Sequence, residues 1–257
     1  AGVTRTRPIA LASFIAAGSL LCGALLASCG TGDDAALRVM AASSLTDAFD
    51  ELASAFEATD VGAAVDIQLV VAGSSRLATQ LEEGAPGDVV ATADQLTMAR
   101  IVATGRVRGE PAVFASNTMV VARHPGTMEI DDLADLADPD ILVAMCAEQV
   151  PCGALAQDVL AAGAVTLEPT TREPNVRSVL TRVVLGEVDA GFVYTTDARG
   201  AGTDVEVYVP PEADGLTNPY PIATLSDDPA ALAFFDFVLT DGQEILADYG
   251  FLSGATE

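Results

Sequence analysis

The sequence contains no lysine, and all twelve of its basic residues are arginine. Against 37 acidic residues they leave a formal net charge of −25. A surface of this charge repels the phosphates of nucleic acid and of anionic lipid, so we expect neither as a partner. A small anion also meets this repulsion, although salt screens it beyond about 8 Å. If the chain binds an anion, the attraction must come from local dipoles inside a cleft.

Histidine is almost absent as well, and this argues against metal binding and catalysis. The single histidine, His124, precedes the turn signal Pro125-Gly126, and no set of ligands stands at metal spacing. The segment GSSRL does not match the nucleophile motif G-x-S-x-G of serine hydrolases. We therefore expect no metal ligands, no cofactor and no enzymatic activity.

The N-terminus has the pattern of an export signal. Arg5 and Arg7 precede an apolar run over 8–28, which is typical of a secretory signal peptide. The alternative is a single membrane-spanning anchor, because the run is about long enough to span. The ending Leu-Ala-Ser-Cys resembles a bacterial lipobox, in which Cys29 becomes the lipidated first residue. The sequence thus predicts a signal peptide over 1–28 and a tether over 29–36.

Two cysteines remain in the part of the chain that is predicted to be exported. Cys146 and Cys152 are six residues apart, and an oxidising compartment favours a disulfide between them. The alternative is two separate thiols that pack as small hydrophobic side chains.

After the tether, strands and helices alternate, which predicts parallel sheets with helices on both faces. A β-rich stretch over 111–125 interrupts this rhythm, and a second α/β unit follows it. The predicted strands are 37–42, 65–72, 88–93, 141–146, 190–195, 205–210 and 220–225. The predicted helices begin near Leu45, Ser75, Gln95, Cys152, Asn175 and Asp228, and the last helix ends at Gly250.

Two of the strand-to-helix junctions carry paired serines. VMAASSLTDA (39–48) and VVAGSSRLAT (70–79) each turn from an apolar strand into an amphipathic helix. A helix begins with unpaired N–H groups and the positive end of its dipole. Two such helix starts that point at one place predict an anion site without a charged side chain.

Several motifs in order resemble the molybdate-binding proteins of bacterial molybdate ABC importers. The resemblance runs from about residue 37 to the C-terminus, in the segments VMAASSLTDAFDELASAF, VVAGSSRLATQLEEGAPGDVVATADQ, VPCGALAQDVL, NVRSVLTRVVLGEVDAGFVYTTDA and YPIATL. It implies the two-lobed α/β fold of periplasmic binding proteins of type II, in which each lobe is a mixed, mainly parallel sheet flanked by helices and two strands cross between the lobes. It places lobe 1 at 37–115 plus 211–257 and lobe 2 at 116–210.

The resemblance also implies five contacts to an oxyanion. They are the hydroxyls of Ser44, Ser74 and Tyr194 and the backbone N–H groups of Cys152 and Val176. Two positions depart from the family pattern, because Gly73 replaces a serine that is common in relatives and Cys152 replaces a familiar alanine. Since the contact at 152 is made by the backbone, the change of side chain need not abolish it.

Structural alternatives exist for these residues. Ser44 with Asp47 has capping-box spacing, and Ser74 has the position of a helix cap. The side chain of Val176 continues an apolar helical stripe, and Tyr194 fits a buried core tyrosine with a satisfied hydroxyl. Arg177, next to the site in sequence, is expected to form a structural ion pair.

The implied protein is a monomeric extracytoplasmic lipoprotein, held at the outer face of the cell membrane by its lipid anchor. It captures molybdate or tungstate and delivers the ion to an ABC permease. The alternatives are binding of sulfate or another tetrahedral oxyanion, and an oxyanion sensor without transport. Phosphate is disfavoured because it carries a proton at neutral pH and none of the five contacts is a carboxylate.

Overall fold

The computed structural model describes residue 2 and residues 36–254. Apart from Gly2 and Ala36, the predicted signal peptide and tether, with Cys22 and the predicted lipidation site Cys29, lie outside the described residues. Among the residues described, no helix has both the length and the apolar character needed to cross a membrane.

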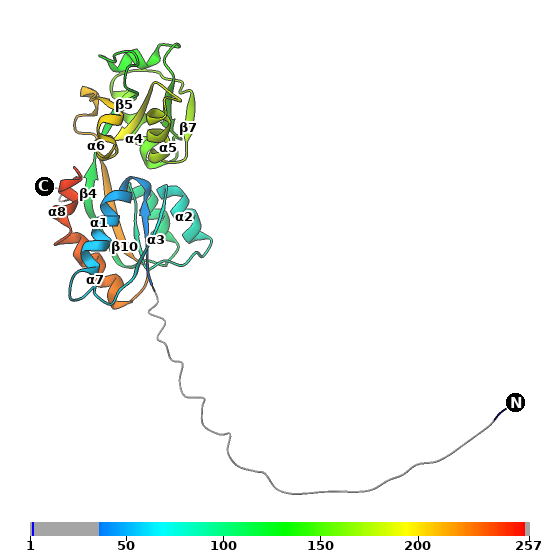
Figure 1. Ribbon diagram of the computed structural model, residues 1–257, viewed down its shortest axis with the longest axis vertical. Coiled ribbons are helices and arrows are strands. Elements are labelled where there is room, and N and C mark those ends of the chain that lie inside the picture. The colour runs from blue at the N-terminus through cyan, green and yellow to red at the C-terminus, as the bar shows by residue number, and fades with distance from the viewer. Residues whose placement is uncertain (1, 3–35, 255–257) are drawn as a thin grey trace, which may run out of the picture. The chain divides into compact units, whose positions relative to one another are not determined.

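The first lobe is built on a six-stranded sheet within residues 36–254, with the order β11-β4-β10-β3-β1-β2 (Figure 1). Its strands are β1 (Leu37–Ala42), β2 (Ile67–Ala72), β3 (Val89–Ala91), β4 (Arg108–Asn117), β10 (Asn218–Thr224) and β11 (Leu252–Ser253). β1 pairs in parallel with β2 and β3, whereas β10 is antiparallel to both β3 and β4.

Helices cover both faces of this sheet because the side chains of β1 alternate in direction. Val39 and Ala41 belong to the same buried cluster as Phe49, and Met40 belongs to the cluster of Leu77. Each fully buried large side chain contributes roughly 1.5–3 kcal/mol. The helices of this lobe are α1 (Thr46–Glu57), α2 (Ser74–Glu82), α3 (Gln95–Ala103), α7 (Pro229–Leu239) and α8 (Gln243–Asp248).

The second lobe contains a five-stranded sheet with the order β7-β6-β8-β5-β9 in the described chain. Its strands are β5 (Met119–Arg123), β6 (Val143–Cys146), β7 (Thr171–Glu173), β8 (Ala190–Tyr194) and β9 (Glu206–Tyr208). The helices α4 (Pro151–Ala162), α5 (Val176–Val184) and α6 (Thr195–Ala201) pack on it.

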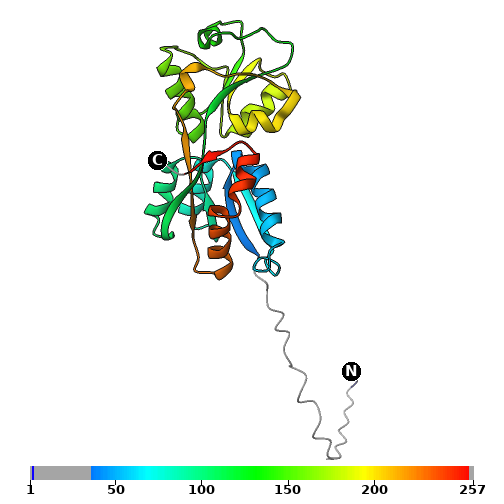
Figure 2. The same cartoon turned by 90° about the vertical axis from the view of Figure 1, so that its left-hand side faces the viewer.

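Two connections join the lobes. β4 leads directly into β5 through Thr118, and β9 returns to β10 through residues 209–217. Figure 2 shows both crossover strands, β4 in green and β10 in orange, running from the first lobe toward the second. The predicted lobe boundaries at 115/116 and 210/211 stay a prediction.

The predicted fold class is confirmed. Both sheets are mixed, and from the pairings four of the six strands in the first sheet and four of the five in the second run in one direction. The prediction missed the short strand β7 and the helix α6, which begins at Thr195 where a strand end was expected.

Candidate functional site

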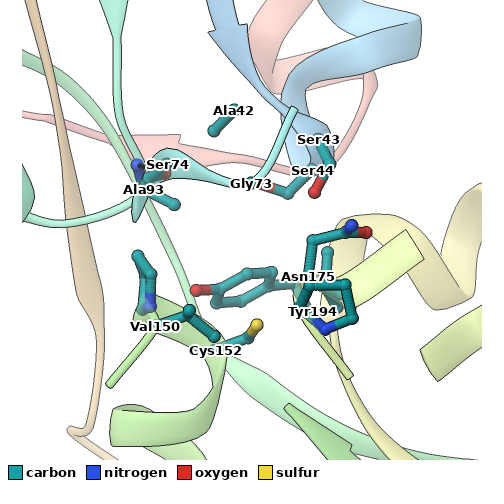
Figure 3. A pocket seen from close by; sticks show the side chains of 13 residues that line it. Ala42, Ser43, Ser44, Gly73, Ser74, Ala93, Val150, Cys152, Asn175 and Tyr194 are labelled. Atoms are coloured by element: carbon teal, nitrogen blue, oxygen red, sulfur yellow. Dashed lines mark hydrogen bonds between the residues drawn. The ribbon is translucent and has the colours of Figure 1, made fainter. Parts of the chain in front are cut away.

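A cavity lies where strand ends and helix starts of the two lobes meet, and we call it the interlobe cavity. Its lining residues are Ala42, Ser43, Ser44, Gly73, Ser74, Ala93, Val150, Pro151, Cys152, Pro174, Asn175, Val176 and Tyr194. Figure 3 shows Ser44, Gly73 and Ser74 of the first lobe on one side and Val150, Cys152 and Tyr194 of the second on the other.

The structure brings all five predicted contact residues to this one cavity. They are far apart in the sequence, and each is at most 5% exposed. Ser44 lies in the 3-10 turn Ser43–Leu45 before α1, and Ser74 is the first residue of α2. Cys152 and Val176 are in the first turns of α4 and α5, and Tyr194 ends β8. Their role as ligands stays a prediction.

Neither serine caps a helix, so that alternative is wrong. The turn at Ser43–Leu45, α1 and α2 begin without any side-chain cap bond. The Ser44 hydroxyl is instead 2.9 Å from the hydroxyl of Tyr220, and Ser74 Oγ accepts from the N–H of Ala93 at 3.0 Å. The first N–H groups of these helices therefore keep their hydrogen-bonding capacity toward the cavity.

The start of α4 is fixed by its sequence. Pro151 at the first helical position has no N–H, which leaves Cys152 with the first available donor. Cys152 is joined to Cys146 at the end of β6 by the predicted disulfide. Gly153 is required for space, because a Cβ at this residue lies only 2.0 Å from the carbonyl oxygen of Ala147. The VPCG motif thus sets the direction of the Cys152 N–H.

The start of α5 has both a structural and a cavity-facing function. The side chain of Asn175 caps the helix by accepting from the Ser178 N–H at 3.0 Å. The side chain of Val176 is buried in the core, as its apolar stripe predicted. Its N–H belongs to the first turn, where helical N–H groups have no intrahelical acceptor.

Tyr194 is a buried tyrosine with a satisfied hydroxyl that also lines the cavity. Its hydroxyl oxygen accepts from Asn218 Nδ2 at 2.8 Å. Burial raises the pKa of Tyr194 well above its ordinary value, and the contact with Asn218 only partly opposes this. The hydroxyl therefore keeps its proton at neutral pH and remains a donor.

The interlobe cavity has no charged side chain in its described lining. It combines three hydroxyls with the starts of four helical segments, each of which carries about half a positive charge. Among residues 36–254 there is also no group of three His, Cys, Asp or Glu side chains placed for a metal ion. An acceptor-rich, fully ionised small anion matches this set of neutral donors.

Sequence analysis missed three polar residues behind the cavity. Asn117 ends β4, and Asn218 and Tyr220 lie on β10. Asn218 and Tyr220 are two residues apart, so they point to the same side of the strand. This alternation in NPYPIAT was a signal for paired polar side chains, but it did not reveal their partners.

Arg177 forms the expected structural ion pair beside the cavity. It bridges Asp47 of α1 in the first lobe and Asp197 of α6 in the second, with Arg177 Nε 3.0 Å from Asp197 Oδ1. Burial raises the pKa of Asp197 to about 7, Arg177 opposes this and Asp47 adds to it. Asp197 is thus a buried acid that is partly protonated near neutral pH.

We expect Asp197→Asn to change how stability depends on pH. In the folded protein the pKa of Asp197 is about 7, against an ordinary value of 3.8. The native state then binds the extra proton between these values, and its free energy of unfolding falls as the pH rises through this window. Asparagine does not titrate, so the free energy of unfolding of the variant does not fall in this way. Denaturant unfolding of both proteins between pH 4 and 8 measures this effect. The free energy of unfolding of the variant should increase relative to that of wild type as the pH rises to about 7. A difference between the two proteins that stays constant with pH contradicts the assignment.

The lobes also touch beside the cavity at α2. Ser75 Oγ donates to the carbonyl of Gln149 at 3.3 Å. A Cβ at Gly73 lies 2.8 Å from the carbonyl oxygen of Pro174, so this contact has room only for glycine. The close approach gives a physical reason for glycine at position 73.

Comparison with known proteins agrees with this geometry. The family described as bacterial extracellular solute-binding protein matches residues 37–252. The chain belongs to this family. The solute-binding protein is 37% identical over 250 residues to the molybdate-binding protein of Mycobacterium tuberculosis (strain ATCC 25618 / H37Rv), covering 94% of this chain and 95% of the relative. The resemblance predicted from the motifs is confirmed, and the family is extracellular, in agreement with the expected extracytoplasmic location.

Solved structures support the fold of the solute-binding protein. The periplasmic molybdate-binding protein of Azotobacter vinelandii matches with a TM-score of 0.73 and 18% identity, over 84% of this chain and 98% of that one. The sulfate-binding protein of Mycobacterium tuberculosis H37Rv matches with a TM-score of 0.71 and 21% identity, over 84% and 86%. At these identities the likeness concerns the fold alone.

Proposed function

We propose that this solute-binding protein captures molybdate or tungstate outside the cytoplasm and delivers it to an ABC permease. The ion occupies the interlobe cavity. It accepts hydrogen bonds from the hydroxyls of Ser44, Ser74 and Tyr194 and from the N–H groups of Cys152 and Val176. Cys29, once acylated, holds the protein at the outer face of the membrane, and the protein acts as a monomer.

The observation that carries this proposal is the convergence of neutral donors in one buried cavity. Hydrogen bonds to a charged acceptor contribute about 1.5–3 kcal/mol each. Five of them, together with the dipoles of the helix starts, offset the cost of removing the ion from water. Micromolar or tighter affinity, about −8 kcal/mol or better, is then within reach.

The chemistry of the cavity favours an anion without a proton. A proton on the anion needs an acceptor, and no carboxylate lines the cavity in the described chain. Sulfate meets this condition and is the second candidate, because only its smaller size separates it from molybdate.

The direct test is calorimetric titration of the purified protein with molybdate, tungstate, sulfate and phosphate. We expect molybdate and tungstate to bind most tightly and phosphate to bind least. A sulfate affinity above that of molybdate establishes the second candidate in place of the first.

Ligand binding should also stabilise the fold. A ligand at a hundredfold excess over its Kd adds about 2.7 kcal/mol to the free energy of unfolding. We therefore expect a higher melting temperature in millimolar molybdate or tungstate, with chloride at equal ionic strength as the control. A melting temperature that neither oxyanion changes is evidence against the assignment.

A further inference from the structure

The protons of the cavity hydroxyls have directions that the surrounding donors determine. A hydroxyl has one proton to donate and lone pairs to accept. When its oxygen already accepts from the protein, its own proton is free to point elsewhere. For an anion site this difference decides whether a hydroxyl attracts the ligand or repels it.

At Tyr194 the direction follows from Asn218. The Asn218 amide nitrogen lies 2.8 Å from the Tyr194 hydroxyl and 3.2 Å from the carbonyl oxygen of Pro151. A carbonyl only accepts, so its contact supports the placement of the NH₂ end at this side. Tyr194 Oη must then accept from Asn218, and its proton is left for the cavity that Tyr194 lines.

Ser44 has a different kind of partner. Tyr220 is fully buried, and its hydroxyl is 2.9 Å from Ser44 Oγ. Either hydroxyl can donate in this pair, so the contact alone gives the Ser44 proton no fixed direction. Ser44 therefore differs from Tyr194, whose partner is an amide nitrogen that only donates.

At Ser74 the donor is a backbone N–H group. Ser74 Oγ accepts from the N–H of Ala93 at 3.0 Å, and Ser74 is 2% exposed. The hydroxyls of Tyr194 and Ser74 therefore each accept one bond from the protein and have a proton left to donate. Hydroxyls in this arrangement bind an anion that has only acceptors. They provide no acceptor for an anion that carries a proton.

We propose that Asn218 is a positioning residue, which turns the proton of Tyr194 toward a bound oxyanion. It lies on the crossover strand β10, where it pairs in register with Asn117 at the end of β4. The strands that connect the lobes thereby set the selectivity of the cavity for a fully deprotonated anion. This inference rests on the proposed function.

The test uses one variant with a matched control. Asn218→Asp replaces the donor to Tyr194 by an acceptor. Gln243→Glu controls for the amide-to-carboxylate change, because Gln243 donates to Phe114 and Val238 within the first lobe.

Calorimetry with molybdate and inorganic phosphate should separate positioning from stability. We expect molybdate affinity to fall about tenfold in Asn218→Asp, since a hydrogen bond contributes about 0.5–1.5 kcal/mol. The control variant should keep wild-type affinity, even if its melting temperature without ligand falls. In Asn218→Asp the preference for molybdate over phosphate should also decrease, because the Tyr194 proton turns to the new carboxylate and its oxygen becomes an acceptor.

Two outcomes distinguish this inference from the proposed function. If wild type binds molybdate and Asn218→Asp binds it within twofold of wild type, the positioning role is refuted and the proposed function stands. If wild type binds none of molybdate, tungstate and sulfate, the proposed function fails, and the positioning role fails with it.

Discussion

Ser74→Ala should weaken molybdate binding by about 1–3 kcal/mol, a factor of roughly 5 to 150. Ser74 is buried and its Oγ accepts from the Ala93 N–H, so under the proposed function its proton is the donor to the ligand. Alanine then leaves part of a buried anion without a partner. Ser44→Ala should have an effect of similar size, because Ser44 is also buried and lines the same cavity. Calorimetric titration gives both values.

The control for these variants is Ser54→Ala on α1. Ser54 is exposed, and its hydroxyl donates only to the carbonyl of Asp50 in the preceding turn. Its molybdate affinity should equal that of wild type. If Ser44→Ala and Ser74→Ala lose stability and yet bind normally once folded, the serines are structural and the five-contact site is wrong.

Gly153→Ala should lower the free energy of unfolding by about 3 kcal/mol or more and weaken binding as well. The new Cβ meets the carbonyl oxygen of Ala147 at 2.0 Å and that of Cys146 at 2.9 Å. Both atoms are backbone, and the disulfide between Cys146 and Cys152 limits how far this loop can yield. The clash must therefore move the start of α4, where the Cys152 N–H faces the cavity. Denaturant unfolding and calorimetry measure the two effects.

Gly200→Ala is the matched control in α6. A Cβ there has as its nearest neighbour Asp47 Oδ2 at 3.5 Å, an ordinary contact, and alanine is the better helix former. This variant should be as stable as wild type or more stable. Equal behaviour of the two glycine variants contradicts the steric role of Gly153.

Local sequence patterns predicted most of the elements because each is encoded within a few residues. The strand over 37–42 and the helix near 95–104 correspond to β1 and α3 within a residue. The prediction missed α6 because its seven residues, Thr195–Ala201, directly follow a buried strand and have no apolar periodicity of their own. Such a short helix depends on tertiary packing rather than on propensity.

The candidate site was predictable only as far as its helix starts. Serines after apolar strands and the Pro151 motif mark donors in the sequence itself, and the resemblance collects them into one site. The partners of those donors were not predictable, because Ser44 and Tyr220 are 176 positions apart and meet only in the folded protein. The sequence contains no local pattern that specifies this pairing.

The contacts between the lobes outside the cavity have a thermodynamic consequence. Asp47 with Arg177, and Ser75 with Gln149, join the lobes without touching the cavity through those side chains. A partly exposed ion pair contributes about 0.2–1 kcal/mol, which shifts the equilibrium between joined and separated lobes by a factor of roughly 1.4 to 5. The apparent Kd is the intrinsic one divided by the fraction of molecules that are competent to bind. Substitutions at Asp47 or Ser75 should therefore change the apparent Kd for the solute, although neither residue lines the cavity. A partner protein that separates the lobes lowers the affinity for the solute. By linkage, the bound solute lowers the affinity for that partner by the same factor.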